Sequence, residues 1–315
     1  MRNNILIIKH GALGDIILAG PAMQAIRKHH KNDFIVCLTI DTYADTLEIC
    51  PWIDKVIVDI KPKWNDVKGW HRLRNLFLKY KFIKVYDLQT SYRSNIYFYF
   101  FFFLRAVVWS GIAYGSKYRH SNPKRKFMHT FDRHKDQLKL CGIKYDKIPD
   151  WKWLSKNYEN RNLLPSKDFA IIVPGSSPHR IDKRWNKNSF SQLIKELSKL
   201  GIKSLLLGSK NEKEYIDSII NMLDNKILLK PLNYAGKTNF KDIVFLSDKA
   251  KFAIGNDTGP MHLIASTGLV TVVLFGFDSD PNLCAPIGKR VKIIKEDNIN
   301  SINIDDVINI LNSVL

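Results

Sequence analysis

The sequence contains few cysteines, and they are scattered. Cys37, Cys50, Cys141 and Cys284 form no C-x-x-C pair within the 315 residues, which argues against a disulfide framework or a zinc knuckle and fits a reducing compartment. No cluster of His and carboxylate residues has metal-ligand spacing, so we predict no metal site and no cofactor. The loop G-x-x-x-x-G-K-[ST] does not occur either, which argues against phosphate hydrolysis.

Long apolar runs are also missing. The run at residues 5–8 is short and ends at Lys9, so it predicts a buried first strand and not a signal peptide. Residues 96–104 are nearly all aromatic and end at Arg105, well short of the roughly 20 residues that span a bilayer. A buried core helix is one interpretation of this run. A helix whose outer face enters a bilayer surface is the other.

Basic residues are abundant. Lys and Arg number 49 against 30 Asp and Glu, which gives a formal charge of +19. Such an excess favours an anionic partner, such as a phosphorylated substrate or an anionic lipid surface, although a lysine-rich solvated surface explains it equally well. No helix-turn-helix, RNA-binding sheet signature or basic zipper is present, so we do not expect nucleic acid as a partner.

Short apolar runs alternate with amphipathic stretches in both halves of the chain. The first half predicts strands at residues 5–8, 34–39, 56–59 and 83–87, with helices at 16–29 and 67–80. After a polar linker at 143–167, the pattern restarts with strands at 169–173, 204–207, 252–254 and 271–275. This alternation predicts an α/β protein of two parallel-sheet domains, at residues 1–160 and 161–315.

A glycine turn follows the first predicted strand, in the segment Lys9-His10-Gly11-Ala12-Leu13-Gly14-Asp15. Glycine lets the backbone approach a ligand closely, and a nearby helix N-terminus favours an ionised Asp15. Such a carboxylate can accept a proton from an attacking hydroxyl. It can equally serve only as a helix cap.

A second glycine turn lies in the other half, in the run Gly255-Asn256-Asp257-Thr258-Gly259-Pro260-Met261-His262. It joins a strand to a helix predicted at residues 263–266, and the N–H groups at such a helix start can bind a diphosphate. Pro260 suits the first helical turn. An ordinary strand-to-helix turn is the alternative.

Three smaller groups of polar residues also follow predicted strands. The loop with Ser176, together with Lys183 and Arg184, suits phosphate oxygens. Glu212 lies where a nucleoside pocket would have its edge, and Gln89 with Arg93 could contact an acceptor. Ordinary loop chemistry is the alternative for these last two groups.

Taken in this order, the motifs resemble glycosyltransferase family 9, the lipopolysaccharide heptosyltransferases; the Gly255–His262 run is the most specific of them. The resemblance implies a GT-B fold, with two Rossmann-like domains facing across a cleft, an acceptor site in the first and a nucleotide-sugar site in the second. Asp15 matches the general base, and Gly11, Gln89 and Arg93 fall on the acceptor side. The implied donor-binding residues are Ser176, Lys183, Glu212, Asp257, Thr258, Gly259, Pro260, Met261 and His262.

The implied reaction is metal-independent transfer of a heptose from ADP-heptose, with inversion, to a phosphorylated, lipid-linked inner-core acceptor. The resemblance also implies a peripheral enzyme on the cytoplasmic face of the inner membrane, in contact with an anionic lipid surface. Three alternatives remain open: a family member that uses another nucleotide sugar, a binding protein without catalysis, and an epimerase of the same fold.

Overall fold

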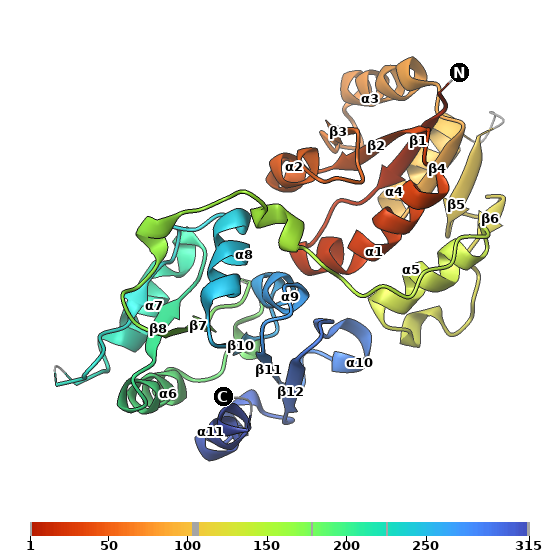
Figure 1. Ribbon diagram of the computed structural model, residues 1–315. Coiled ribbons are helices and arrows are strands. Elements are labelled where there is room, and N and C mark those ends of the chain that lie inside the picture. Colours follow the sequence, from red (N-terminus) through yellow and green to blue (C-terminus); the bar gives the residue numbers. More distant parts are fainter. Residues whose placement is uncertain (1, 103–106, 178, 225, 314–315) are drawn as a thin grey trace. The chain divides into compact units, whose positions relative to one another are not determined.

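A computed structural model describes residues 2–102, 107–177, 179–224 and 226–313. The chain forms two compact units, Met1–Lys147 and Ile148–Leu315. Figure 1 shows strands and helices alternating along the chain in both. Residues 148–160, which the sequence analysis assigned to the first domain, pack in the second unit, where the Tyr158 hydroxyl donates to Asp242 and its ring contacts Phe245.

The first unit contains a six-stranded parallel sheet in the order β3-β2-β1-β4-β5-β6, the strand order of a Rossmann fold. Helices α1 and α5 pack against each other. The strands are β1 (Asn4–Ile8), β2 (Phe34–Thr39), β3 (Lys55–Val58), β4 (Lys84–Asp87), β5 (Val108–Gly111) and β6 (Tyr118–Arg119). The helices are α1 (Leu13–His29), α2 (Asp41–Glu48), α3 (Val67–Tyr80), α4 (Tyr92–Tyr97) and α5 (Thr130–Lys139).

The second unit repeats this topology. Its order β12-β11-β10-β7-β8-β9 is again that of a Rossmann fold when its strands are counted from β7. The strands are β7 (Phe169–Val173), β8 (Lys203–Leu206), β9 (Leu232–Asn233), β10 (Ala253–Asn256), β11 (Thr271–Phe275) and β12 (Val291–Lys295). The helices are α6 (Lys187–Lys199), α7 (Lys213–Ile220), α8 (Phe240–Lys249), α9 (Gly259–Ser266), α10 (Pro281–Cys284) and α11 (Ile304–Asn312).

Continuous apolar runs form the central strands because helices cover both faces of such sheets. The side chains of Ile5–Ile8 in β1 are fully buried, and every residue of β7 is buried. Polar residues set the helix starts: Asp66 accepts from the Gly69 N–H before α3, and Asn186 accepts from the Ser189 N–H before α6. The structure confirms the predicted strands 34–39, 169–173 and 271–275 to the residue.

The aromatic run at 96–104 lies only partly in the described residues, which exclude 103–106. Tyr97 and Phe98 are buried, and Phe98 packs against Trp109, whereas Tyr99 and Phe100 are exposed. The core-helix interpretation therefore holds for the first part of the run. In the part of the chain that the structure describes, no helix combines the length and the apolar character that a bilayer crossing requires.

Candidate functional site

Each sheet has one point where the strand order reverses, between β1 and β4 and between β7 and β10. Ligands of open α/β sheets bind beyond the carboxyl ends of the strands at this point. In the second unit these strand ends lead to Ser176 and to Asp257. In the first unit they lead to the Gly11 turn and to Gln89. The topology thus brings together motifs that are far apart in the sequence.

Asp257 is the centre of the site in the second unit. Its Oδ2 lies 2.6 Å from Lys183 Nζ and accepts a hydrogen bond of 2.6 Å from the Ser279 hydroxyl. His262 Nε2 lies 3.8 Å from Asp257 Oδ1. Burial alone would raise the pKa of Asp257, but the contacts with His262, Lys183 and Ser279 outweigh burial and lower this pKa to about 2.

This lowered pKa predicts an acid-dependent loss of stability. A carboxylate whose pKa is lower in the folded state stabilises the fold above its unfolded pKa of about 3.9, and the contribution disappears as the pH falls toward about 2. Between pH 5 and pH 3 the loss is about 1 kcal/mol. Urea unfolding at these two pH values should show a correspondingly weaker pH dependence for Asp257→Asn than for the wild type. Equal pH dependence of the two proteins would contradict this assignment.

Asn256 connects the two strand ends at the reversal point. Its fully buried amide donates to the carbonyls of Pro174 and Gly175, at 2.8 and 3.2 Å, and accepts from the Trp185 N–H at 3.1 Å. It therefore fixes the loop that carries Lys183. An uncharged amide suits this buried position because its N–H groups and its oxygen both have hydrogen-bond partners here.

Ser176 holds Arg184 in place. Its hydroxyl donates to the Arg180 carbonyl at 2.7 Å and accepts from Arg184 Nε at 3.0 Å, and the Arg184 guanidinium lies 4.4 Å from the Tyr215 ring centroid. Ser176 itself is buried. It therefore supports the loop, and Arg184 is the more exposed polar group of the two.

Glu212 lies against the same loop. Its Oε2 accepts from both the N–H and the hydroxyl of Ser209, each at 2.7 Å. A Cβ atom at Gly175 would lie 1.7 Å from Glu212 Oε1, so only glycine leaves room for this carboxylate. The structure therefore brings Glu212 beside the loop that carries Ser176 and Lys183.

The start of α9 provides a further group of donors. The helix begins at Gly259, four residues earlier than predicted, with Thr258 as N-cap and Pro260 in the first turn. No hydrogen bond from the described residues reaches the buried Thr258 hydroxyl or His262 Nδ1. Met261 is fully buried and serves the core. The free N–H groups typical of a helix start suit an anion here.

Asp278-Ser279-Asp280, an Asp-x-Asp sequence that the sequence analysis overlooked, follows β11. Ser279 binds Asp257, and Asp280 Oδ1 accepts from the Asn282 N–H at the start of α10. Among the residues that the structure describes, no group of three His, Cys, Asp or Glu side chains could hold a metal ion.

In the first unit, Asp15 lies half-buried in the first turn of α1, and its Oδ2 accepts from the Ala12 N–H at 3.1 Å. Asp15 is therefore not the N-cap residue, which is Ala12, but one of its oxygens binds the N–H of that residue. Gly11 has a φ of +127°, which L side chains rarely adopt, and a Cβ there would lie 2.6 Å from the Tyr43 ring. Glycine is therefore required in this turn.

The neighbouring His10 belongs to a buried network. Its N–H donates to Gln89 Oε1 at 2.9 Å, and its Nε2 lies 2.8 Å from Asp59 Oδ2. The Tyr97 hydroxyl donates to the same Asp59 oxygen at 2.5 Å. Burial opposes ionisation of Asp59, but these contacts with His10 and Tyr97 outweigh it and lower the pKa of Asp59. Gln89 therefore holds the turn from across the reversal point.

Cationic groups surround the end of β4. Burial raises the pKa of Asp87 to about 6. Burial also lowers the pKa of Lys9, and the nearby carboxylates of Asp15 and Asp87 partly offset this lowering. Arg125 donates to the Thr90 hydroxyl at 2.7 Å; burial and the nearby Arg133 lower its pKa to about 10. The partly exposed Arg125 suits an anionic ligand.

Arg93 has a different environment from Gln89. Its guanidinium lies 5.2 and 5.8 Å from the ring centroids of Trp64 and Trp70, and its Nη1 donates to the Pro62 carbonyl at 3.1 Å. It thus packs in an aromatic cluster, and the structure does not bring it into hydrogen-bond contact with the Gly11 turn.

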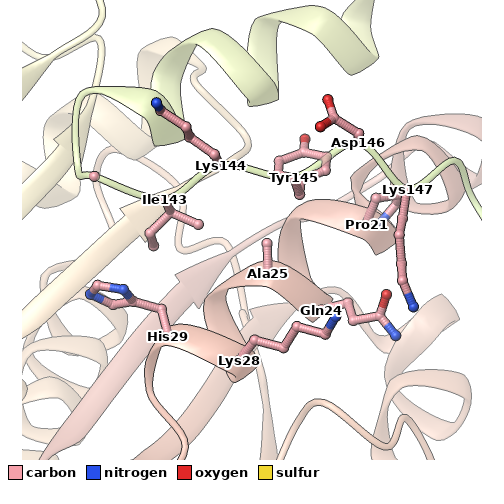
Figure 2. A pocket seen from close by; sticks show the side chains of 11 residues that line it. Pro21, Gln24, Ala25, Lys28, His29, Ile143, Lys144, Tyr145, Asp146 and Lys147 are labelled. Atoms are coloured by element: carbon pink, nitrogen blue, oxygen red, sulfur yellow. The ribbon is translucent and has the colours of Figure 1, made fainter.

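A cavity of about 330 Å³ lies elsewhere in the first unit. Figure 2 shows side chains of α1 facing those of the segment after α5. None of the predicted site residues lines it; its lining comprises Pro21, Gln24, Ala25, Lys28, His29, Gly142, Ile143, Lys144, Tyr145, Asp146 and Lys147.

Comparison with known proteins identifies the family of the chain. The family model described as glycosyltransferase family 9 (heptosyltransferase) matches residues 70–308. The lipopolysaccharide core heptosyltransferase OpsX of Haemophilus influenzae is 22% identical over 306 residues, covering 92% of this chain and 84% of that protein.

Solved structures show the same fold. A glycosyltransferase family 9 protein from Veillonella parvula superposes with a TM-score of 0.81 at 19% identity, over 99% of this chain and 97% of that one. The heptosyltransferase WaaC of E. coli with ADP gives a TM-score of 0.77 at 18% identity, over 99% and 100%. The predicted α/β class of two Rossmann-like domains, GT-B, is confirmed.

Proposed function

Since the chain belongs to glycosyltransferase family 9 and is therefore a glycosyltransferase, we propose that it transfers a heptose from ADP-heptose to a phosphorylated, lipid-linked inner-core acceptor of lipopolysaccharide. The family description and the relative from Haemophilus support the sugar and the acceptor class. The ADP complex of a protein with the same fold supports the nucleotide.

The observation that carries this proposal is the cluster of Lys183, Asp257, His262 and Ser279 beside the start of α9. A sugar–diphosphate bond breaks more easily when positive charge balances the leaving diphosphate. Lys183 and the N–H groups of α9 supply that charge, so the proposed reaction uses no metal ion. Asp257 binds a sugar hydroxyl, and Glu212 binds the nucleoside.

The first unit binds and activates the acceptor. Asp15 accepts the proton of the acceptor hydroxyl while the oxygen of that hydroxyl bonds to the anomeric carbon of the donor. The bond between this carbon and the diphosphate breaks, and the nucleoside diphosphate leaves with its electron pair. A single displacement inverts the configuration at that carbon. Arg125 balances acceptor phosphate or carboxylate groups, and Gly11 and Gln89 shape the turn that the acceptor meets.

We place this reaction at the cytoplasmic face of the inner membrane, with the protein peripheral to an anionic lipid surface. The net charge of +19 and a lipid-linked acceptor support this placement.

A thermal-shift screen of nucleotide sugars tests the donor. ADP-heptose at 100 times its Kd should raise the free energy of unfolding by about 2.7 kcal/mol, with a clear rise in Tm, whereas UDP- and GDP-sugars should not. A larger shift with another nucleotide sugar would overturn the donor assignment. Binding of ADP-heptose without transfer to any extracted acceptor would favour a non-catalytic protein.

A further inference from the structure

Four aromatic residues of the first unit form a continuous cluster at the surface. We call Trp64, Trp70, Tyr92 and Phe100 the aromatic patch. Trp64 contacts Trp70 and Tyr92, at centroid distances of 5.6 and 6.2 Å, and Trp70 contacts Phe100 at 5.5 Å. Trp64 is 58% exposed, Tyr92 77% and Phe100 65%. A soluble protein rarely exposes so much contiguous aromatic surface without a partner for it.

The segment that carries the patch is strongly basic. Residues 60–100, all of which the structure describes, contain nine Lys or Arg residues and only two acids. Asp87 is buried, and Asp66 is half-buried and caps α3. Exposed cations lie near the patch in sequence, at Lys61, Lys63, Lys68, Arg72 and Arg74. The residues of this segment in the exposed class therefore carry only positive charge.

We infer that the aromatic patch is the surface that docks the enzyme on an anionic lipid bilayer. Trp and Tyr favour the level of the lipid headgroups, because their rings are apolar and their polar atoms remain hydrated. Lysine and arginine beside them attract anionic headgroups. Val67, which is 77% exposed at the start of α3 and three residues after Trp64 in the sequence, adds an exposed aliphatic side chain.

The ring geometry distinguishes this partner from single-stranded nucleic acid, which also combines aromatic and basic residues. Base stacking needs open ring faces. Trp64 and Trp70 stack on each other with an interplanar angle of 23°, and Arg93 lies over both rings. The faces that stack on each other are therefore closed to a base, and Arg93 lies against both rings, so this pair suits insertion among lipids better than base stacking.

The patch also lies close to the Gly11 turn. The Tyr97 ring contacts Trp70 and His10, at centroid distances of 6.1 and 6.3 Å, while its hydroxyl binds Asp59. One buried aromatic layer thus separates the docking surface from the turn that we assign to the acceptor. This inference rests on the proposed function, because a lipid-linked acceptor would be presented from the same bilayer.

Flotation with vesicles of phosphatidylcholine, with and without phosphatidylglycerol, tests the inference without any donor or acceptor. Wild-type protein should float with the anionic vesicles, and the double variant Trp64→Ala/Tyr92→Ala should bind them about tenfold more weakly, because membrane binding scales with the apolar area inserted. Lys61→Glu/Lys63→Glu should weaken binding at least as much, at about fivefold for each lysine lost.

Phe127→Ala is the matched control, since Phe127 is 69% exposed with Lys126 Nζ 4.8 Å from its ring centroid but lies outside the patch. It should float like the wild type, as should Lys152→Glu/Lys156→Glu. Lipids brominated near the headgroups should quench tryptophan fluorescence in the wild type and much less in Trp64→Phe. All variants should keep the wild-type kcat/KM with a soluble, delipidated acceptor, which would show that the substitutions affect membrane binding and not catalysis.

Equal flotation of the patch variant and the wild type would overturn the inference. The inference would also fail if light scattering showed a dimer for the wild type and a monomer for the patch variant, because the patch would then bind a second copy. It would fail as well if the wild type bound single-stranded RNA, the patch variant did not, and neither bound the vesicles.

Discussion

Asp15→Asn should lower kcat about a thousandfold while the affinity for the donor stays unchanged. A general base contributes on the order of 10²–10⁴ to a rate, and an amide cannot accept the acceptor proton. The substitution is informative because an asparagine oxygen can still accept the Ala12 N–H, as Asp15 Oδ2 does at 3.1 Å. The turn therefore keeps its hydrogen bond and loses only the charge. Single-turnover kinetics and donor calorimetry would measure the two effects.

Asp15→Ala is the companion variant, because it removes both the base and the capping hydrogen bond, which is worth about 1 kcal/mol. If Asp15→Asn retained near-normal turnover while Asp15→Ala lost stability, Asp15 would be a helix cap and nothing more.

Lys183→Met should cost both stability and donor affinity. It leaves Asp257 as a buried carboxylate without its cation, and breaking a buried ion pair by removing one partner costs about 3 kcal/mol. It also removes a charge-assisted contact to the diphosphate, so donor affinity should fall about tenfold to a hundredfold. Chemical unfolding and donor calorimetry would measure these losses.

Two further variants separate the effects. Lys195→Met removes the same charge from an exposed position on the following helix, α6, and should change neither quantity. Lys183→Met/Asp257→Asn should recover part of the lost stability, since the unpaired carboxylate is gone, but not the donor affinity. If the double variant were as unstable as the sum of its two single changes, the pair would not be coupled.

The sequence predicted the central architecture well because parallel strands buried on both faces are continuous apolar runs. It did not predict β6 and β9, which have two residues each, too few to show a pattern. It also missed β5, which follows the aromatic run, and β12, whose five residues include two lysines and are half-buried or exposed. The start of α9 was placed too late because the continuous apolar run that marks the helix begins only at Leu263, although Pro260 already fits a first helical turn.

The candidate site could be predicted only where its residues share a motif. Asp257 and His262 lie in one run, and Lys183 follows a strand of the same half, so these residues could be grouped from the sequence. Ser279 and the His10–Asp59 contact were not, because sheet order joins residues from different strands. Arg93 shows the reverse case: it lies near Gln89 in sequence but packs among the aromatic patch.

The most direct test of the proposed function is transfer itself. The enzyme would be incubated with ADP-heptose and an inner-core lipid acceptor in the presence of EDTA, and the product would be characterised by mass spectrometry and NMR. We predict the addition of one heptose, ADP release, and an anomeric configuration opposite to that of the donor. Retained configuration, a requirement for added metal, or heptose release without an acceptor would contradict the proposed reaction.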